Sequence, residues 1–133
     1  MLAVSLVAIS FPCQEKQMRD HNKLRAFELA DEVALLTYKF TANFPREEQF
    51  GLTSQMRRAA VSVPSNIVEG CGRQTEAEFL RFLDIAYGSL RELEYQTSLG
   101  VRLGFGADHP DYQSKLNKTS KVLAALIRSI RKS

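Results

Sequence analysis

The sequence predicts an all-α protein, folded as an antiparallel up-down-up-down bundle of four helices. Apolar residues recur at spacings of three and four along four separate segments, which is the period of an amphipathic helix. No segment alternates apolar and polar residues between turn signals as a strand would. The 133 residues, 44% of them hydrophobic and 25% charged, suffice for one core. We therefore expect one bundle domain over residues 20–133.

Residues 1–19 precede this pattern as an N-terminal extension. The stretch up to Cys13 is apolar, but it has no basic residue in front of it, is too short to span a bilayer and lacks a small-x-small cleavage site. We expect the extension to be disordered or to reflect a misassigned start, with Met18 as an alternative initiator. Without an export signal, the expected location is the cytoplasm.

The first helix is predicted from Lys23 to about Asn43. A stripe of apolar residues follows one face of it, namely Ala26, Leu29, Ala30, Val33, Leu36, Phe40 and Phe44. A second, roughly opposite arc is apolar as well, and it comprises Leu24, Phe27, Leu35 and Tyr38. Pro45 and Gly51 then interrupt the helical pattern.

The second helix is expected to begin near Thr53, which can act as its N-cap. Its apolar face comprises Leu52, Met56, Ala59, Ala60, Val63, Ile67 and Gly70. The small residues on this face, Gly70 among them, would let another backbone approach closely. Pro64 removes one main-chain hydrogen bond, so we expect a bend there without an end of the helix. Gly70 and Gly72 are expected to end the helix through a left-handed C-cap.

The third helix is predicted to start at a capping box, Thr75-Glu76-Ala77-Glu78, and to run as far as Gly104. Its apolar residues also occupy two faces, the lesser of which holds Ile85, Leu99 and Leu103. The principal face comprises Phe79, Phe82, Leu83, Ala86, Leu90, Leu93, Thr97 and Val101. Because the first and third helices both carry a second apolar face, a monomer would leave apolar surface in water. We therefore expect a homo-oligomer.

The fourth helix is predicted to begin with Asp108 or His109 as N-cap and Pro110 in its first turn. It is cleanly amphipathic, with an apolar face formed by Leu116, Leu123, Leu126, Ile127 and Ile130. Residues 112–133 carry six basic side chains and no acid, whereas residues 1–111 carry 12 basic and 15 acidic ones. The net charge of +3 therefore hides a concentration of positive charge on this helix.

The sequence contains no pattern typical of an enzyme, a metal site or a cofactor site. His21 and His109 have no serine, cysteine or carboxylate at a spacing that would form a triad or zinc site. Cys13 and Cys71 are far apart, and Cys71 is expected to be a small packing residue. The Gly-Cys-Gly-Arg sequence at residues 70–73 is too short for a phosphate-binding loop.

Basic residues form the candidate nucleic-acid site, since lysine and arginine neutralise phosphates. The first group lies on the fourth helix and comprises Lys115, Lys118, Lys121, Arg128, Arg131 and Lys132. A second group, Arg57, Arg58 and Arg73, flanks a polar line on the second helix formed by Arg58, Ser62, Ser65 and Glu69, with Asn66 adjacent. This line is either an internal ladder of ion pairs and hydrogen bonds or a recognition strip.

Two segments, FGLTSQMRRAAVSVPSNIVEGCGR and EFLRFLDIAYGSLRELEYQ, resemble the four-helix bundle proteins encoded in intervening sequences of bacterial 23S ribosomal RNA genes. The likeness covers roughly residues 20–130. Val68 replaces the usual alanine, and Cys71 replaces a common aromatic residue. The motif positions are Pro64, Asn66, Glu69, Gly70, Gly72 and Gly88.

The resemblance implies a non-enzymatic bundle that assembles into a ring-like homopentamer with a role connected to RNA. A related branch, the accessory proteins of diversity-generating retroelements, consists of similar basic pentamers that bind a reverse transcriptase and nucleic acid. Two hypotheses follow. The protein binds RNA or DNA through its basic surfaces, or it is a scaffold or accessory subunit for a partner enzyme such as a reverse transcriptase.

Overall fold

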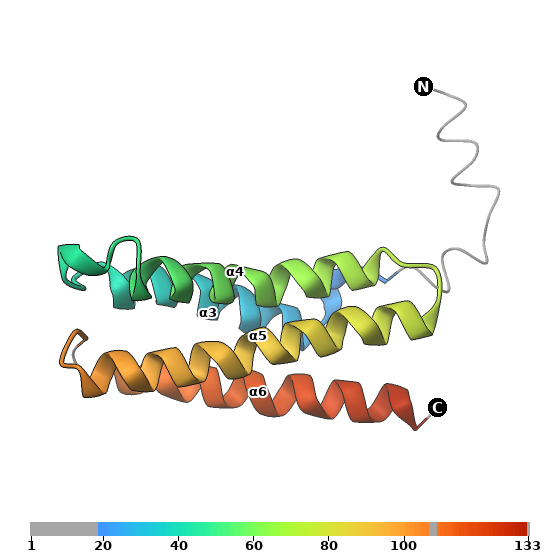
Figure 1. Ribbon diagram of the computed structural model, residues 1–133. Helices are drawn as coiled ribbons and strands as arrows, with labels where there is room; N and C mark the ends of the chain where they lie inside the picture. The colour runs from blue at the N-terminus through green and yellow to red at the C-terminus, as the bar shows by residue number, and fades with distance from the viewer. Residues whose placement is uncertain (1–18, 107–108, 133) are drawn as a thin grey trace.

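The computed structural model describes residues 19–106 and 109–132, and the predicted N-terminal extension up to residue 18 lies outside them. Four long helices form the body of the protein (Figure 1): α3 (Arg25–Thr41), α4 (Leu52–Cys71), α5 (Glu76–Arg102) and α6 (Pro110–Arg131). Two short 3-10 helices, η1 (His21–Lys23) and η2 (Arg46–Glu48), precede α3 and α4. No strand occurs in the described residues, which confirms the all-helical class.

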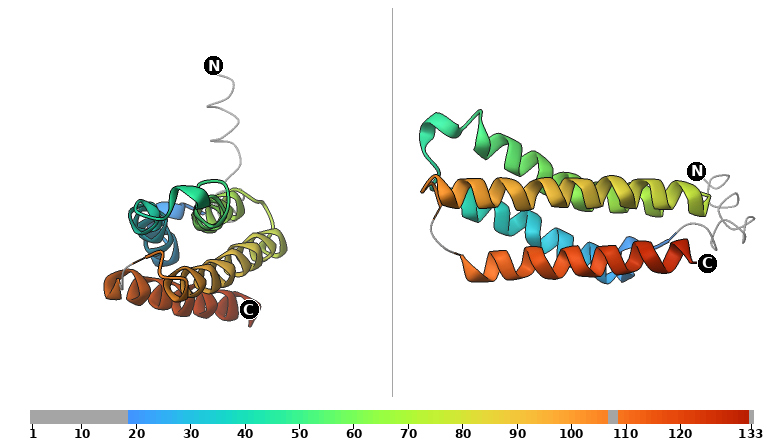
Figure 2. Two further views of the ribbon diagram at one scale, coloured as in Figure 1. Left: turned by 60° about the vertical axis from the view of Figure 1, so that its left-hand side comes forward. Right: turned by 60° about the horizontal axis from the view of Figure 1, so that its bottom comes forward.

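The helices are arranged in two layers of two, with α3 and α4 in one layer and α5 and α6 in the other (Figure 2). Helix α4 packs against both α3 and α5, and α6 packs against both α5 and α3. In Figure 1 the α3–α4 and α5–α6 connections lie at one end of the molecule, and the α4–α5 connection lies at the other. Because α3 and α5 are the neighbours of both α4 and α6, helix α6 lies diagonally opposite α4.

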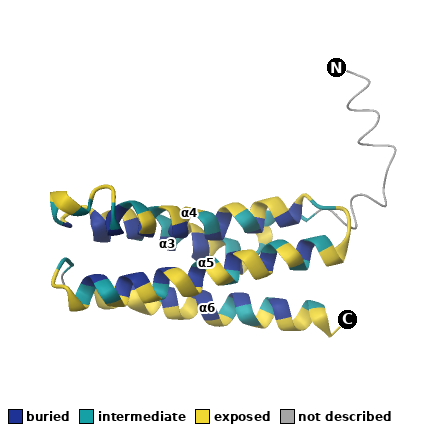
Figure 3. Cartoon of the chain, viewed as in Figure 1, coloured by how far each residue is buried: buried dark blue, intermediate teal, exposed yellow. Residues whose placement is uncertain are grey.

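The core lies between the layers, where each helix turns its buried stripe inward (Figure 3). Leu29, Met56, Phe79 and Leu123 come from the four different helices, and each is 0% exposed. Their burial follows the predicted apolar stripes. Removing such side chains from water stabilises the fold by about 1.5–3 kcal/mol each.

Helices α4 and α5 approach one another closely at Gly70. A Cβ atom added at this glycine would lie 3.0 Å from the Cβ of Phe82 and 3.3 Å from the carbonyl oxygen of Phe79. The expectation of a close backbone approach at Gly70 is thus confirmed. Helix α4 also continues through the buried Pro64 as far as Cys71, as expected.

The start of α5 was predicted correctly, whereas the start of α4 was not. The hydroxyl of Thr75 accepts a hydrogen bond from the amide of Glu78 at 3.1 Å, which confirms the cap. Helix α4 begins at Leu52 with Gly51 in the N-cap position, so Thr53 is inside the helix. The cap is supplied from the preceding turn, because Oε1 of Glu48 accepts from the Leu52 amide at 2.9 Å.

The prediction of a left-handed cap at the end of α4 is also wrong. Gly72 has φ −84° and ψ −2°, which is right-handed backbone, and its amide donates to the carbonyls of Val68 and Glu69. The chain then turns directly, with the Arg73 amide donating to the Gly70 carbonyl at 3.0 Å. Among the described residues only Gly104, just after α5, has a positive φ.

One polar contact ties three helices together inside the core. Thr37 of α3 donates its hydroxyl to the carbonyl of Val33 at 2.7 Å, so its oxygen accepts from the Tyr112 hydroxyl of α6 at 2.8 Å. Thr97 of α5 lies 3.4 Å from the same tyrosine oxygen. Because these polar groups satisfy one another, they can be buried without a large desolvation cost.

Within residues 19–106 and 109–132, no helix has the length and apolar character that crossing a membrane requires.

Candidate nucleic-acid interface

Helix α6 divides into a core face and a basic face. Leu116, Leu123 and Ile127 are buried, and Leu126 and Ile130 pack against the core at its edge. Pro110 occupies the first turn as predicted, and His109 holds the N-cap position without a side-chain cap bond. The other candidate cap, Asp108, lies outside the described residues.

Four of the six predicted cations on α6 form a continuous strip, which we call the basic stripe: Lys118, Lys121, Arg128 and Lys132. All four are exposed, and none forms an ion pair with a described carboxylate. At 3.6 residues per turn their positions fall within about 80° of helix arc, and the strip is about 21 Å long. The basic stripe is therefore a row of exposed cations without ion pairs on one side of one helix, although Lys118 is near enough to Glu32 to contribute to the lowered pKa of that carboxyl.

The other two cations of α6 contact neighbouring helices. Nζ of Lys115 lies 2.6 Å from Oε2 of Glu32 on α3. The ammonium donates a hydrogen bond to this carboxylate and attracts its negative charge, which holds the pKa of Glu32 below its usual range. Arg131 forms an ion pair with Asp84 of α5. These two ion pairs connect α6 to α3 and α5, and the paired carboxylates partly neutralise the charges of Lys115 and Arg131 within the protomer.

The second predicted group of arginines is not brought together. Arg57 donates from Nε to the Thr41 hydroxyl at 2.9 Å, and its guanidinium lies over the Tyr38 ring at 4.5 Å from the centroid. Arg58 is exposed and has no ion pair among the described residues. Arg73 lies about four turns further along and pairs with Glu69.

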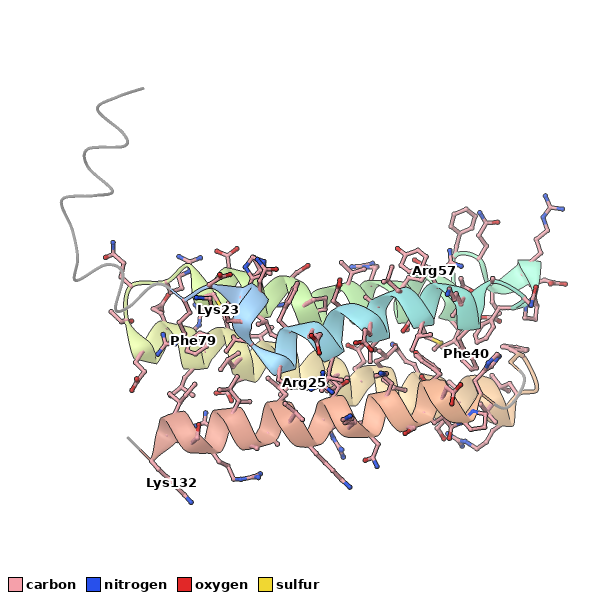
Figure 4. The ribbon with its side chains drawn as sticks, turned by 180° about the vertical axis from the view of Figure 1, so that it is seen from behind. Lys23, Arg25, Phe40, Arg57, Phe79 and Lys132 are labelled. Atoms are coloured by element: carbon pink, nitrogen blue, oxygen red, sulfur yellow. The ribbon has the colours of Figure 1, made fainter. Side chains whose placement is uncertain are left out.

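Within this second group, Arg57 lies far from the C-terminal end of the basic stripe. Figure 4 shows Arg57 on the side of α3 away from α6, whereas Lys132 lies on α6 at the opposite end of the bundle. The contacts between helices agree, because α4 adjoins α3 and α5 while α6 is its diagonal partner. Arg57 and the basic stripe thus lie on separate surfaces of the bundle.

The polar line on α4 forms a ladder only in its middle. The Ser62 and Ser89 hydroxyls share a hydrogen bond of 2.8 Å between α4 and α5, and Asn66 donates to the Ser62 carbonyl at 2.8 Å. The ends are not joined, because Glu69 pairs with Arg73 one turn later rather than with Arg58. The structure therefore supports the ladder interpretation at Ser62 and Asn66 and does not extend it to Arg58.

The described cysteine and the two histidines pack against neighbouring side chains. Cys71 is 1% exposed, and burial raises the pKa of its thiol, so it packs as a small apolar residue, as predicted. His21 and His109 contact the ring edges of Phe27 and Phe40. No group of three or more histidine, cysteine, aspartate or glutamate side chains among the described residues could hold a metal ion.

Large apolar side chains are exposed on α3, α4 and α5 but not on α6, as far as the structure describes them. The second apolar arcs of α3 and α5 are only partly covered: Leu24, Phe27 and Leu99 pack against the core. The others remain in contact with water, and the full exposed set is Leu35, Tyr38, Phe50, Val61, Val68, Ile85, Tyr95 and Leu103.

The sequence analysis missed an open groove of about 650 Å³ beside α3 and α4. Tyr38, Phe50, Arg57 and Arg58 contribute to its lining, and Phe50 is 89% exposed. An aromatic residue placed in a turn, outside every helical stripe, was the signal that could have identified it.

The fold and charge distribution define a small all-helical protein with one basic helix. Its family follows from comparison, because residues 22–128 match the model of the 23S rRNA-intervening sequence proteins, and the chain belongs to that family. A solved protein of unknown function from the S23 ribosomal protein family of Bacteroides thetaiotaomicron is similar at 26% identity, with a TM-score of 0.67 over 77% of this chain and 95% of that one. No curated protein matches significantly.

Proposed function

We propose that this protein is a non-enzymatic, cytoplasmic, oligomeric bundle that binds RNA or other nucleic acid through phosphate contacts. The observation that carries the proposal is the basic stripe, with its four exposed cations and no carboxylate partner among the described residues. Contacts to phosphate give affinity that does not depend on sequence. The proposal therefore predicts little discrimination between sequences.

The distribution of apolar surface supports the same assignment. All the large exposed apolar residues described lie outside α6, and Ala125 is the small apolar side chain exposed within the arc of the basic stripe. The stripe is therefore a mainly polar surface suited to a hydrated polyanion. The apolar surfaces of α3, α4 and α5 are suited to contacts with further protein instead. A partner on those surfaces would leave α6 free.

The assembly that we propose is a ring-like homopentamer of up-down-up-down bundles. Its support is the uncovered second apolar arc of α3 and α5, exemplified by Leu35 at 63% and Leu103 at 53% exposure, together with the family resemblance. Repetition of the basic stripe around a ring would multiply the field that a nucleic acid experiences. Native mass spectrometry gives the copy number directly, and a monomeric mass would contradict the assembly.

The test of nucleic-acid binding is a comparison of two variants with equal charge loss. The stripe variant carries Lys118→Gln, Lys121→Gln, Arg128→Gln and Lys132→Gln, and we expect it to lose most of its affinity for duplex RNA at low salt. The control removes four exposed cations elsewhere, through Lys23→Gln, Lys39→Gln, Arg46→Gln and Arg81→Gln. Equal losses in both variants, or no binding by the unmodified protein, would contradict the proposal.

The alternative is a scaffold or accessory subunit for a partner enzyme such as a reverse transcriptase. Val61 and Val68, two turns apart on α4 and both more than a third exposed, favour a protein contact there. Affinity purification with and without nuclease treatment separates the two functions. A partner that stays bound after nuclease treatment and is lost with Val68→Asp would support the scaffold.

A further inference from the structure

The groove beside α3 and α4 combines flat aromatic surface with unopposed positive charge. Phe50 is 89% exposed, so its ring is open to water, whereas Tyr38 is 47% exposed and has the Arg57 guanidinium over one face of its ring. Arg57 and Arg58 are the two charged residues in the lining, which contains no acidic side chain. The occupant that complements this groove is flat and negatively charged.

The groove is also partly preorganised. The Thr41 hydroxyl and the Tyr38 ring hold the guanidinium of Arg57, which limits the entropy lost when it binds an anion. The acidic side chain of the adjoining turn is directed elsewhere, because Glu48 caps the first amide of α4. Neither glutamate of η2 contributes to the lining, so the charged side chains in the groove are both positive.

We propose that this groove is a second binding site, which takes unpaired nucleotides of a single-stranded RNA segment. The bases stack on Phe50 and Tyr38, and the phosphates contact Arg57 and Arg58. Stacking on aromatic rings beside a basic groove is how proteins bind single strands without reading their sequence. This inference rests on the proposed function, to which it adds a preference for unpaired RNA.

A second copy of the chain fits the groove less well. An apolar protein surface laid over it would bury Arg58, which has no ion-pair partner among the described residues, at an energetic cost. A nucleic-acid strand brings its own negative charge for both arginines. Charge complementarity thus favours RNA as the occupant.

The test uses the full-length protein with a single-stranded oligoadenylate and a duplex RNA of the same length. Phe50→Ala is expected to weaken binding of the single strand about fivefold or more, and to leave duplex binding unchanged. Tyr95→Ala, which removes an exposed aromatic ring from α5, is the matched control and should change neither. Arg58→Gln is compared in the same way with Arg81→Gln, which removes the same charge from α5.

A spectroscopic measurement distinguishes stacking from charge attraction. An oligoadenylate with one 2-aminopurine should lose fluorescence on binding to the unmodified protein, and Phe50→Ala should restore most of it. Single-strand binding that is equal in Phe50→Ala and Tyr95→Ala would overturn the inference while leaving the proposed function intact. A change in the native mass of Phe50→Ala without a change in its RNA binding would assign the groove to a protein contact. Failure of the unmodified protein to bind either RNA would overturn both proposals.

Discussion

The buried hydroxyl of Tyr112 should make a measurable contribution to the stability of the bundle. The side chain is 2% exposed, and its hydroxyl donates to Thr37 of α3 while lying within reach of Thr97 of α5. Tyr112→Phe removes this oxygen and keeps the ring against Phe40. The substitution therefore isolates one polar contact that connects three helices.

The expected loss is about 1–2 kcal/mol. One well-formed hydrogen bond at 2.8 Å contributes about 1 kcal/mol, and the Thr97 hydroxyl loses a longer contact at 3.4 Å. Thr37 keeps its own bond to the Val33 carbonyl, which limits the penalty on that side. In a domain of this size each kcal/mol corresponds to about 3–6 °C in the unfolding midpoint.

The assay is urea unfolding followed by circular dichroism at one fixed protein concentration. Tyr95→Phe is the matched control, because Tyr95 is 60% exposed and removal of its hydroxyl should change stability little. Equal stability of the two variants would refute the reasoning that the buried hydroxyl network supports the fold.

Alkaline pH provides a second measurement on the same residue. Burial raises the pKa of Tyr112 above its ordinary value of 10.0, so ionisation is easier in the unfolded chain. The stability that depends on the neutral hydroxyl is complete below about pH 10 and is lost as the pH rises toward the folded-state pKa. Stability should therefore fall more steeply above pH 10 in the unmodified protein than in Tyr112→Phe, and parallel profiles would contradict this.

Three further predictions concern glycines and one ion pair. Gly70→Ala should destabilise the bundle by about 1–3 kcal/mol, because the added Cβ would press on the Phe79 carbonyl. Gly88→Ala should stabilise the protomer by about 0.5–1 kcal/mol, because the added Cβ meets no atom within 4 Å and alanine loses less backbone freedom than glycine in a helix. The same urea assay checks both, and the same sign in both variants would contradict the packing described. The hydrogen bond from Lys115 lowers the pKa of Glu32 in the folded protein below its ordinary value of 4.5. The stability that this ion pair contributes should therefore be present above pH 4.5 and be lost as the pH falls through the folded-state pKa. A stability profile of Glu32→Gln should lack this acidic decline, and an unchanged profile would show that the pair is not formed.

Local sequence patterns accounted for most of the fold. Leu29, Met56, Phe79 and Leu123 all lie on predicted stripes and all are fully buried, because helical period alone selects the face that leaves water. The Thr75 cap was predictable for a similar reason, since donor and acceptor are three residues apart.

Features that depend on contacts between elements were not predictable in this way. The start of α4 depends on Glu48, which reaches the first amide from a separate turn. Likewise, Lys115 and Arg131 look like their neighbours in sequence, and only the packing of α6 beside α3 and α5 places carboxylates against them. The basic stripe is what remains of the predicted site once these pairs are formed.

The central claim is that the basic stripe binds nucleic-acid phosphates. Its most direct test is the salt dependence of duplex RNA binding, measured as the slope of log affinity against log salt concentration. Each phosphate contact contributes about 0.9 to such a slope in B-form duplexes, so the stripe variant should show a clearly shallower slope than the unmodified protein and the charge-matched control. Three identical slopes would contradict the claim.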